Sequence, residues 1–117
     1  MIMTEELEVF KRAHKLALEI YSVTKDFPRE EMFGLAAQMR RAAISIDSNL
    51  AEGGARRTSG EYVNFIGNAR GSAAELKYQV SFSCDLGYLN TKTANEITEE
   101  LRQIIFMLSS LMKSIKN

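Results

Sequence analysis

Residues 59–86 read SGEYVNFIGNARGSAAELKYQVSFSCDL, and this stretch decides the fold because it carries two apolar rows at helical spacing. Steps of three and four residues are the spacing of one face of an α-helix. The first such row is Tyr62, Phe65, Ile66, Ala69, Ala73, Leu76 and Val80. We therefore predict one long helix over 59–86, with this row as its core face.

The flanking residues predict where this helix begins and ends. Thr58 and Glu61 stand three apart, as the two partners of a capping box do. Gly87 stands where a glycine cap belongs at a helix C-terminus.

Apolar spacing predicts three further helices, over about 4–25, 31–56 and 91–116. Thr4 is the predicted N-cap of the first, and Asn90 or Thr91 caps the last. The first helix ends before Pro28, because the residue before a proline avoids the α region. Its predicted core row is Leu7, Phe10, Ala13, Ala17, Ile20 and Tyr21. We expect the pair Gly53-Gly54 to loosen the end of the second helix.

Short connections force neighbouring helices to run antiparallel. Four helices that each carry an apolar row bury those rows together, so we expect an all-α, up-down antiparallel four-helix bundle forming a single domain over 1–117. No run of about 18 apolar residues could span a bilayer, so no membrane partner is expected. The lone cysteine, Cys84, cannot form a disulfide within the chain, which favours a reducing compartment and a cytoplasmic protein.

The second row of the 59–86 helix lies roughly opposite the core row and consists of Gly67, Gly71, Ala74, Tyr78 and Phe82. A helix that is apolar on two sides is normally buried on two sides. Within a bundle the second side has no partner, so we predict an oligomer interface with other copies of the chain. The alternative is a skewed bundle in which this helix is simply central.

A polar stripe follows the second helix, at steps of three and four residues: Gln38, Arg41, Ser45, Asn49, Glu52 and Arg56. Buried polar groups need partners, so the stripe could pair with a polar row on a neighbouring helix or subunit. In that arrangement Arg41 would meet Glu75 or Glu61 of the third helix. The alternative, which the sequence supports equally, is that the stripe is exposed to solvent.

Residues 28–57 read PREEMFGLAAQMRRAAISIDSNLAEGGARR, with Arg41-Ala42, Ser45-Ile46, Asn49 and Ala51-Glu52-Gly53 in order. This block resembles the bacterial four-helix-bundle family named for proteins encoded in intervening sequences (IVS) of the 23S rRNA gene, and the resemblance covers nearly the whole chain. It implies a homopentameric ring of four-helix protomers and a biochemical role that is mostly unassigned. One relative, the accessory variability protein of diversity-generating retroelements, has a strongly basic ring that binds nucleic acid. The present chain departs from it in being neutral.

The chain has 15 Lys and Arg against 15 Asp and Glu, which argues against a basic grip over its whole surface, since phosphate binding is mainly charge neutralisation. Three basic clusters are nevertheless candidates for contacts with RNA or DNA: Lys11, Arg12 and Lys15; Arg40 and Arg41; Arg56 and Arg57. An oligomer would repeat each cluster and so raise its apparent affinity. The acidic residues interspersed among them favour an ordinary solvated surface instead.

No catalytic, cofactor or metal site is predicted. The only histidine, His14, is far along the chain from Cys84, so one chain offers no His and Cys set for zinc. We expect His14 to be structural or on the surface, and Cys84 to be a buried small hydrophobe. The sequence also lacks the Glu-x-x-His motif of carboxylate di-metal bundles and a phosphate-binding glycine loop.

The leading hypothesis is therefore a non-enzymatic oligomeric scaffold, a pentamer by resemblance, that binds a protein or nucleic-acid partner. The alternative is an RNA- or DNA-binding protein that uses ring-repeated Arg and Lys patches. An enzyme is the third hypothesis, and it would need a polar pocket with perturbed titrating groups.

Overall fold

The computed structural model describes residues 3–116, which form four α-helices and no strand within that range. The helices are α1 (Glu8–Thr24), α2 (Leu35–Gly54), α3 (Ser59–Asp85) and α4 (Thr91–Lys116), and two short 3-10 turns, η1 (Thr4–Glu6) and η2 (Arg29–Glu31), precede α1 and α2. The predicted all-α fold with four helices is confirmed. No helix in the described range is long and apolar enough to cross a membrane.

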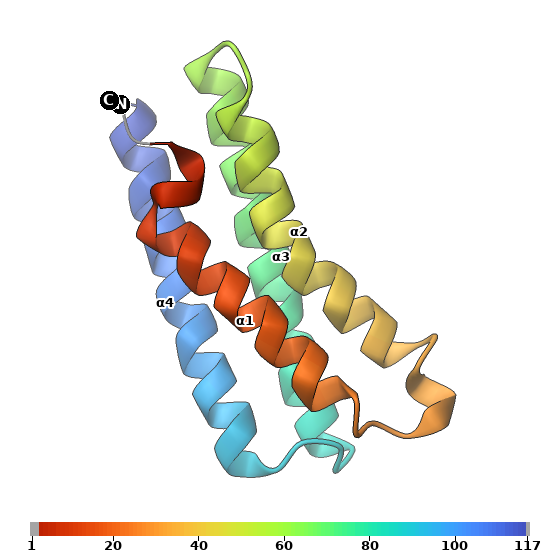
Figure 1. Ribbon diagram of the computed structural model, residues 1–117. Coiled ribbons are helices and arrows are strands. Elements are labelled where there is room, and N and C mark those ends of the chain that lie inside the picture. The colour runs from red at the N-terminus through yellow and green to blue at the C-terminus, as the bar shows by residue number, and fades with distance from the viewer. Residues whose placement is uncertain (1–2, 117) are drawn as a thin grey trace.

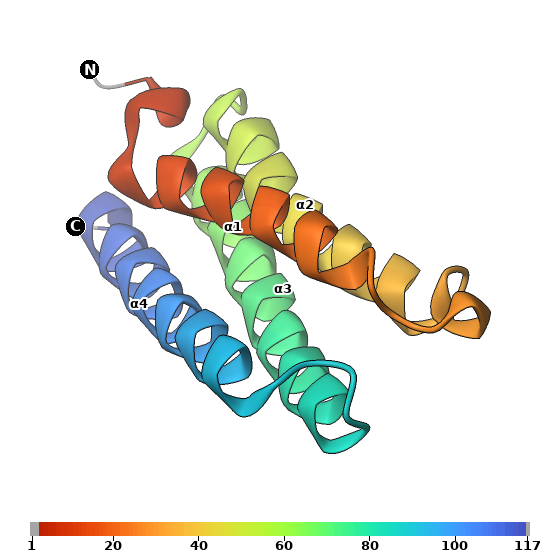
Figure 2. The same cartoon turned by 60° about the horizontal axis from the view of Figure 1, so that its bottom comes forward.

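Each helix packs against its two neighbours in chain order, and α4 closes the bundle against α1. Figures 1 and 2 show the α1–α2 pair crossing the α3–α4 pair, so that the two pairs diverge towards one end. The most extensive packing joins α3 to α2 and to α4, whereas the α1–α4 seam is the sparsest. Among the described elements, the backbones of the diagonal pairs, α1 with α3 and α2 with α4, do not approach as neighbouring helices do, so the helices occupy the four corners of a bundle.

The core runs along the bundle axis and is built from aliphatic side chains of all four helices. Its largest fully buried side chains are Leu16, Ile20, Met39, Ile46, Leu50, Ile66, Leu76, Val80, Ile97, Leu101, Ile104 and Leu108. On α1 the predicted row was partly wrong, because Val9 and Leu16 are buried whereas Tyr21 is exposed. The ring of Tyr21 instead lies 4.7 Å beneath the guanidinium of Arg40 at the edge of the α1–α2 seam.

The predicted start of the first helix at Thr4 was also wrong. Residues 4–6 form the separate turn η1, Leu7 is extended, and α1 begins at Glu8. Thr4 makes no capping hydrogen bond, and its hydroxyl lies 3.4 Å from the hydroxyl of Tyr62. The break in the helix lets Thr4 lie against the end of α2 while Leu7 packs against the core.

The second helix begins later than predicted, at Leu35 rather than near residue 31. The backbone turns at Gly34, and the Glu31 carboxylate accepts a hydrogen bond from the Leu35 N–H at 3.3 Å. The helix ends at Gly54, within the predicted glycine pair, and Gly53 is buried. A Cβ there would lie 2.6 Å from Cβ of Phe65, so glycine permits the close approach of α2 to α3.

The predicted caps are confirmed at both ends of the α3–α4 connection and at the start of α3. The Thr58 hydroxyl accepts from the Glu61 N–H at 3.1 Å, and the Asn90 side chain accepts from the Thr93 N–H at 2.8 Å. Gly87 has a φ of 84°, and the N–H groups of Gly87 and Tyr88 close the paired hydrogen bonds of a Schellman cap.

Candidate functional site

The second apolar row of α3, which we name the α3 outer row (Gly67, Gly71, Ala74, Tyr78 and Phe82), faces away from the core. The buried residues of α3 lie on the opposite side of the helix. Four members of the row are exposed and Gly67 is half-buried. Tyr78 is 68% exposed and Phe82 43%, and their ring centroids lie 6.1 Å apart. The structure therefore leaves an apolar helix face uncovered within the protomer.

Packing within the protomer does not explain the two glycines of this row. At Gly71 an added Cβ would meet nothing within 4 Å, and at Gly67 it would make only an ordinary 3.7 Å contact with Met112. Glycine in a helix interior costs about 1 kcal/mol relative to alanine. Both glycines therefore lower the stability of α3, although a Cβ at either position would fit within the protomer.

The polar stripe of α2 divides into a bonded centre and exposed ends. At the centre the hydroxyls of Ser45 and Ser72 lie 2.9 Å apart across the α2–α3 seam, and the Asn49 amide donates to Ser45. Gln38, Arg41 and Glu52 are exposed. The expected contact of Arg41 with Glu75 or Glu61 was wrong within the chain, because no hydrogen bond or ion pair joins Arg41 to a described side chain.

The three basic clusters lie on separate parts of the bundle, and in each one an arginine is already engaged. Arg12 bonds α4, Arg40 bonds Thr24 and stacks on Tyr21, and Arg56 pairs with Glu52 at 2.8 Å while lying over the ring of Phe65. The remaining members, Lys11, Lys15, Arg41 and Arg57, are exposed. The protomer does not bring these clusters together into one phosphate-binding face.

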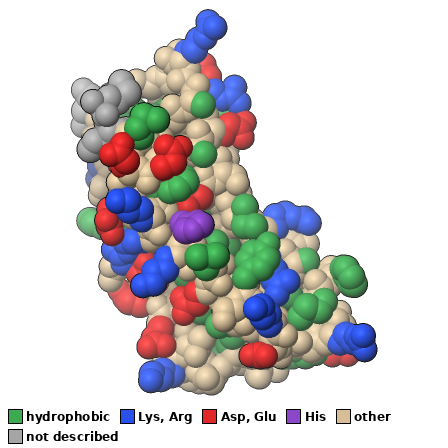
Figure 3. Space-filling model, in the orientation of Figure 1, with side chains coloured by type: hydrophobic (Ala, Val, Ile, Leu, Met, Phe, Trp, Pro, Cys, Tyr) green, Lys and Arg blue, Asp and Glu red, His purple; other side chains and the backbone are tan. Residues whose placement is uncertain are grey.

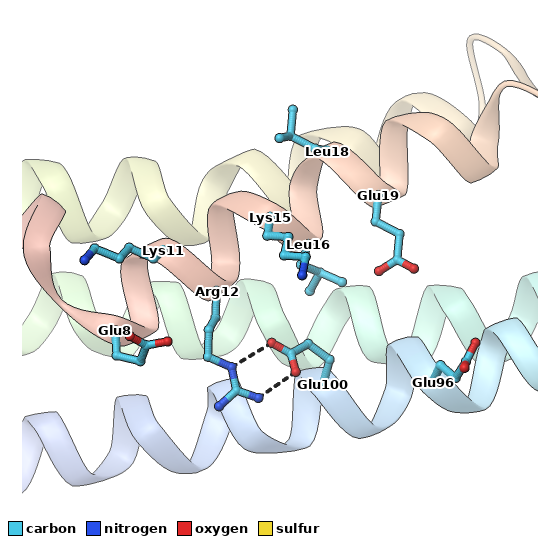
Figure 4. Close-up of a pocket in the computed structure, with 9 residues that line it drawn as sticks. All are labelled: Glu8, Lys11, Arg12, Lys15, Leu16, Leu18, Glu19, Glu96 and Glu100. Atoms are coloured by element: carbon cyan, nitrogen blue, oxygen red, sulfur yellow. Dashed lines mark hydrogen bonds and ion pairs between the residues drawn. The ribbon is translucent and has the colours of Figure 1, made fainter.

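Arg12 is the centre of a groove of about 900 Å³ between α1 and α4 (Figure 4). Its Nε and Nη2 donate to the two carboxylate oxygens of Glu100, at 2.8 and 2.6 Å, and Nη2 also donates to Gln103 at 2.6 Å. This bidentate bonding raises the pKa of Arg12 further above its ordinary value. The groove is lined by four glutamates and three basic residues, so its charges largely compensate each other.

Asp47 is a buried feature that sequence reasoning missed. Both of its carboxylate oxygens are shielded from solvent and have no hydrogen-bond partner among the described residues. Burial raises its pKa from 3.8 to about 7. It lies seven residues from Arg40 and from Gly54, which contact α1 and η1 respectively, so it faces the α1 side of α2. The sequence did contain a sign of this: Asp47 is next to the predicted core residue Ile46 and is two helical turns from both Arg40 and Gly54.

A second missed feature is a largely apolar patch beside the first half of α2, which we name the α2 outer patch (Tyr21 of α1, Phe33 just before α2, and Ala37, Arg41 and Ile44 of α2). These residues help to line a hollow of about 610 Å³. Phe33 is 99% exposed and Ile44 45%. In Figure 3, hydrophobic side chains gather over the lower halves of α1 and α2, with Lys and Arg side chains between them. The spacing of Phe33, Ala37 and Ile44, at four and seven residues, was the signal in the sequence.

The remaining candidates show no convergent chemistry. His14 is exposed, and Cys84 is half-buried and packs against the core. Within residues 3–116, no three side chains of His, Cys, Asp or Glu gather as a metal site would require.

Comparisons with known proteins agree with this architecture. The family model for the 23S rRNA-intervening sequence protein matches residues 5–110. A crystal structure of a protein with unknown function from the S23 ribosomal protein family of Bacteroides thetaiotaomicron superposes with a TM-score of 0.83 at 22% identity, covering 90% of this chain and 95% of that one. No curated protein matches the chain. Because the family model spans most of its length, the chain belongs to the 23S rRNA-intervening sequence protein family.

Proposed function

We propose that the protein is a non-enzymatic, cytoplasmic scaffold that self-associates through the α3 outer row, as a ring-like homo-oligomer, and presents repeated surfaces to a macromolecular partner. We propose five copies per ring on the basis of the family resemblance. The lone Cys84 fits a reducing compartment.

The observation that carries this proposal is the uncovered row itself. It combines exposed aromatic rings, which supply buried area in an interface, with small residues that allow close backbone approach. Glycine at position 71 is unnecessary in the protomer and becomes useful once another chain lies against it.

The test is the molar mass in solution of the wild-type chain and of Gly71→Gln, measured by light scattering over a range of concentrations. We expect a wild-type mass several times 13.2 kDa. Gly71→Gln should lower the mass towards that of one chain, because the longer side chain blocks the approach of a second copy. Its helix content should be unchanged or higher, since glutamine is a better helix former.

Ser114→Gln, on the exposed side of α4, is the matched control and should keep the wild-type mass. The proposal is contradicted if the wild-type chain is a single 13.2 kDa particle, or if Gly71→Gln folds normally and retains the full mass.

The nucleic-acid alternative draws on the exposed cations Lys11, Lys15, Arg41 and Arg57, and on the resemblance to the accessory variability protein. The zero net charge and the internal engagement of three arginines weigh against it. A labelled RNA shifted by the assembled protein at low salt, and released as salt rises, would favour this role. No shift at low salt would remove it.

A further inference from the structure

The α2 outer patch is the best counterpart on this molecule for the α3 outer row. We infer that the α3 outer row of one copy docks on the α2 outer patch of the next copy, with Glu75 facing Arg41, so that the assembly grows by one repeated contact between two different faces. This inference rests on the proposed function and names the second half of the same interface.

The docking is supported by a hollow on one face and exposed rings on the other. The α2 outer patch borders a hollow of about 610 Å³, edged by Tyr21, Phe33 and Ile44. The α3 outer row offers two neighbouring exposed aromatic rings, Tyr78 and Phe82, in line with the small residues Gly71 and Ala74. A buried aromatic anchor in a hollow is a common centre of protein interfaces.

The charges beside the two faces are also complementary. Arg41 borders the hollow on α2, and it is exposed and bonded to no described side chain. Glu75 lies one turn from Gly71 and next to Ala74, and its only described bond is a long 3.5 Å contact with the Gln79 amide. An interface that joins these faces would pair the two charges, which favours the correct partner and register.

A two-fold contact of the α3 outer row with itself lacks this complementarity. The row is centred on Ala74, so a symmetric antiparallel contact there would bring the two Glu75 carboxylates close together. Like charges placed across an interface oppose binding. In the contact with the α2 outer patch, each Glu75 carboxylate instead faces the positive charge of Arg41 on the neighbouring copy.

The experiment uses two full-length variants, each with one face blocked. Tyr78→Arg blocks the α3 outer row and leaves the α2 outer patch intact, and Ile44→Arg does the reverse. Each variant alone should have the mass of one chain, 13.2 kDa. An equimolar mixture should give twice that mass and grow no further, because only one intact face of each kind remains.

Phe106→Arg and Leu18→Arg are matched controls, since both side chains are exposed and lie outside the two faces. They should keep the wild-type mass. If the wild-type chain assembles and Tyr78→Arg divides it while Ile44→Arg does not, the α2 docking is wrong and the proposed function stands. Failure of the two blocked variants to pair on mixing also overturns the docking. A wild-type chain that never assembles overturns the proposed function itself.

Charge exchange is the second test, and it perturbs the surface less than the blocking variants do. Arg41→Glu and Glu75→Arg should each weaken assembly by about tenfold or more, and the chain carrying both changes should recover most of the loss. Two losses that simply add in the double variant would overturn the pairing of Arg41 with Glu75.

Discussion

Arg12 of α1 and Glu100 of α4 are joined by two parallel hydrogen bonds, of 2.8 and 2.6 Å, across the sparsest seam of the bundle. Of the other two ion pairs between described residues, Glu99–Arg102 lies within α4, and Glu52–Arg56 joins α2 to the connection just after its end. The Arg12–Glu100 pair therefore fixes how α1 lies against α4.

We predict that Glu100→Gln lowers the free energy of unfolding by about 1 kcal/mol, because the bidentate geometry is lost although both side chains are partly exposed. Urea unfolding at fixed protein concentration measures this. High salt should reduce the difference between variant and wild type. Glu99→Gln, whose partner Arg102 lies on the same helix, should change stability by much less. Equal effects of the two variants would refute the special position of Glu100.

Asp47 predicts an unusual dependence of stability on pH. The folded state holds its proton with a pKa of about 7, against 3.8 for an unperturbed aspartate. Between these values the folded chain binds more protons than the unfolded chain, so this contribution to stability falls as pH rises from about 4 to about 7 and stays low above.

Asp47→Asn should remove this fall and raise the free energy of unfolding at pH 8. The full displacement of the pKa corresponds to about 4 kcal/mol. Since Asp47 is only half-buried, we expect a gain of about 1–2 kcal/mol. Urea titrations at pH 5 and pH 8 make the comparison, with Ser48→Asn on the exposed side of α2 as the control. A variant that is less stable than wild type at pH 8 would show that the carboxylate is satisfied in solution.

The sequence predicted the helices whose ends and faces depend on local chemistry. The caps at Thr58, Asn90 and Gly87 are formed by residues within a few positions of each other, and all three are present. The core row of α3 was nearly right for the same reason, because helical spacing alone sets which residues share a face.

What the sequence did not predict depends on tertiary contacts. The break at Leu7 reflects packing of η1 against the far end of α2, and the need for Gly53 arises from Phe65, twelve residues away. For the candidate site, the sequence indicated the α3 outer row. It could not show that Arg41 makes no bond to a described side chain, or that the two carboxylate oxygens of Asp47 are shielded from solvent without a hydrogen-bond partner. Both depend on how α2 is rotated in the bundle.

The close approach of α2 to α3 gives a further prediction. Gly53→Ala should destabilise the protomer by about 1–3 kcal/mol, because the new Cβ would lie 2.6 Å from Cβ of Phe65 in a buried position. Gly60→Ala is the control, since a Cβ there meets nothing within 4 Å. Thermal and urea unfolding of both variants would settle the comparison. An undisturbed Gly53→Ala would mean that the two helices can separate at little cost.

Hydroxyl-radical footprinting of Tyr78 and Phe106 in the wild-type protein measures directly whether a second copy covers the α3 outer row. The two rings are almost equally exposed in the protomer, at 68% and 71%, and only Tyr78 lies in the α3 outer row. With each rate divided by its rate in the urea-unfolded chain, we expect Tyr78 to be protected several-fold more than Phe106, because a second copy covers it. Equal protection of the two rings would show that no second copy covers the α3 outer row.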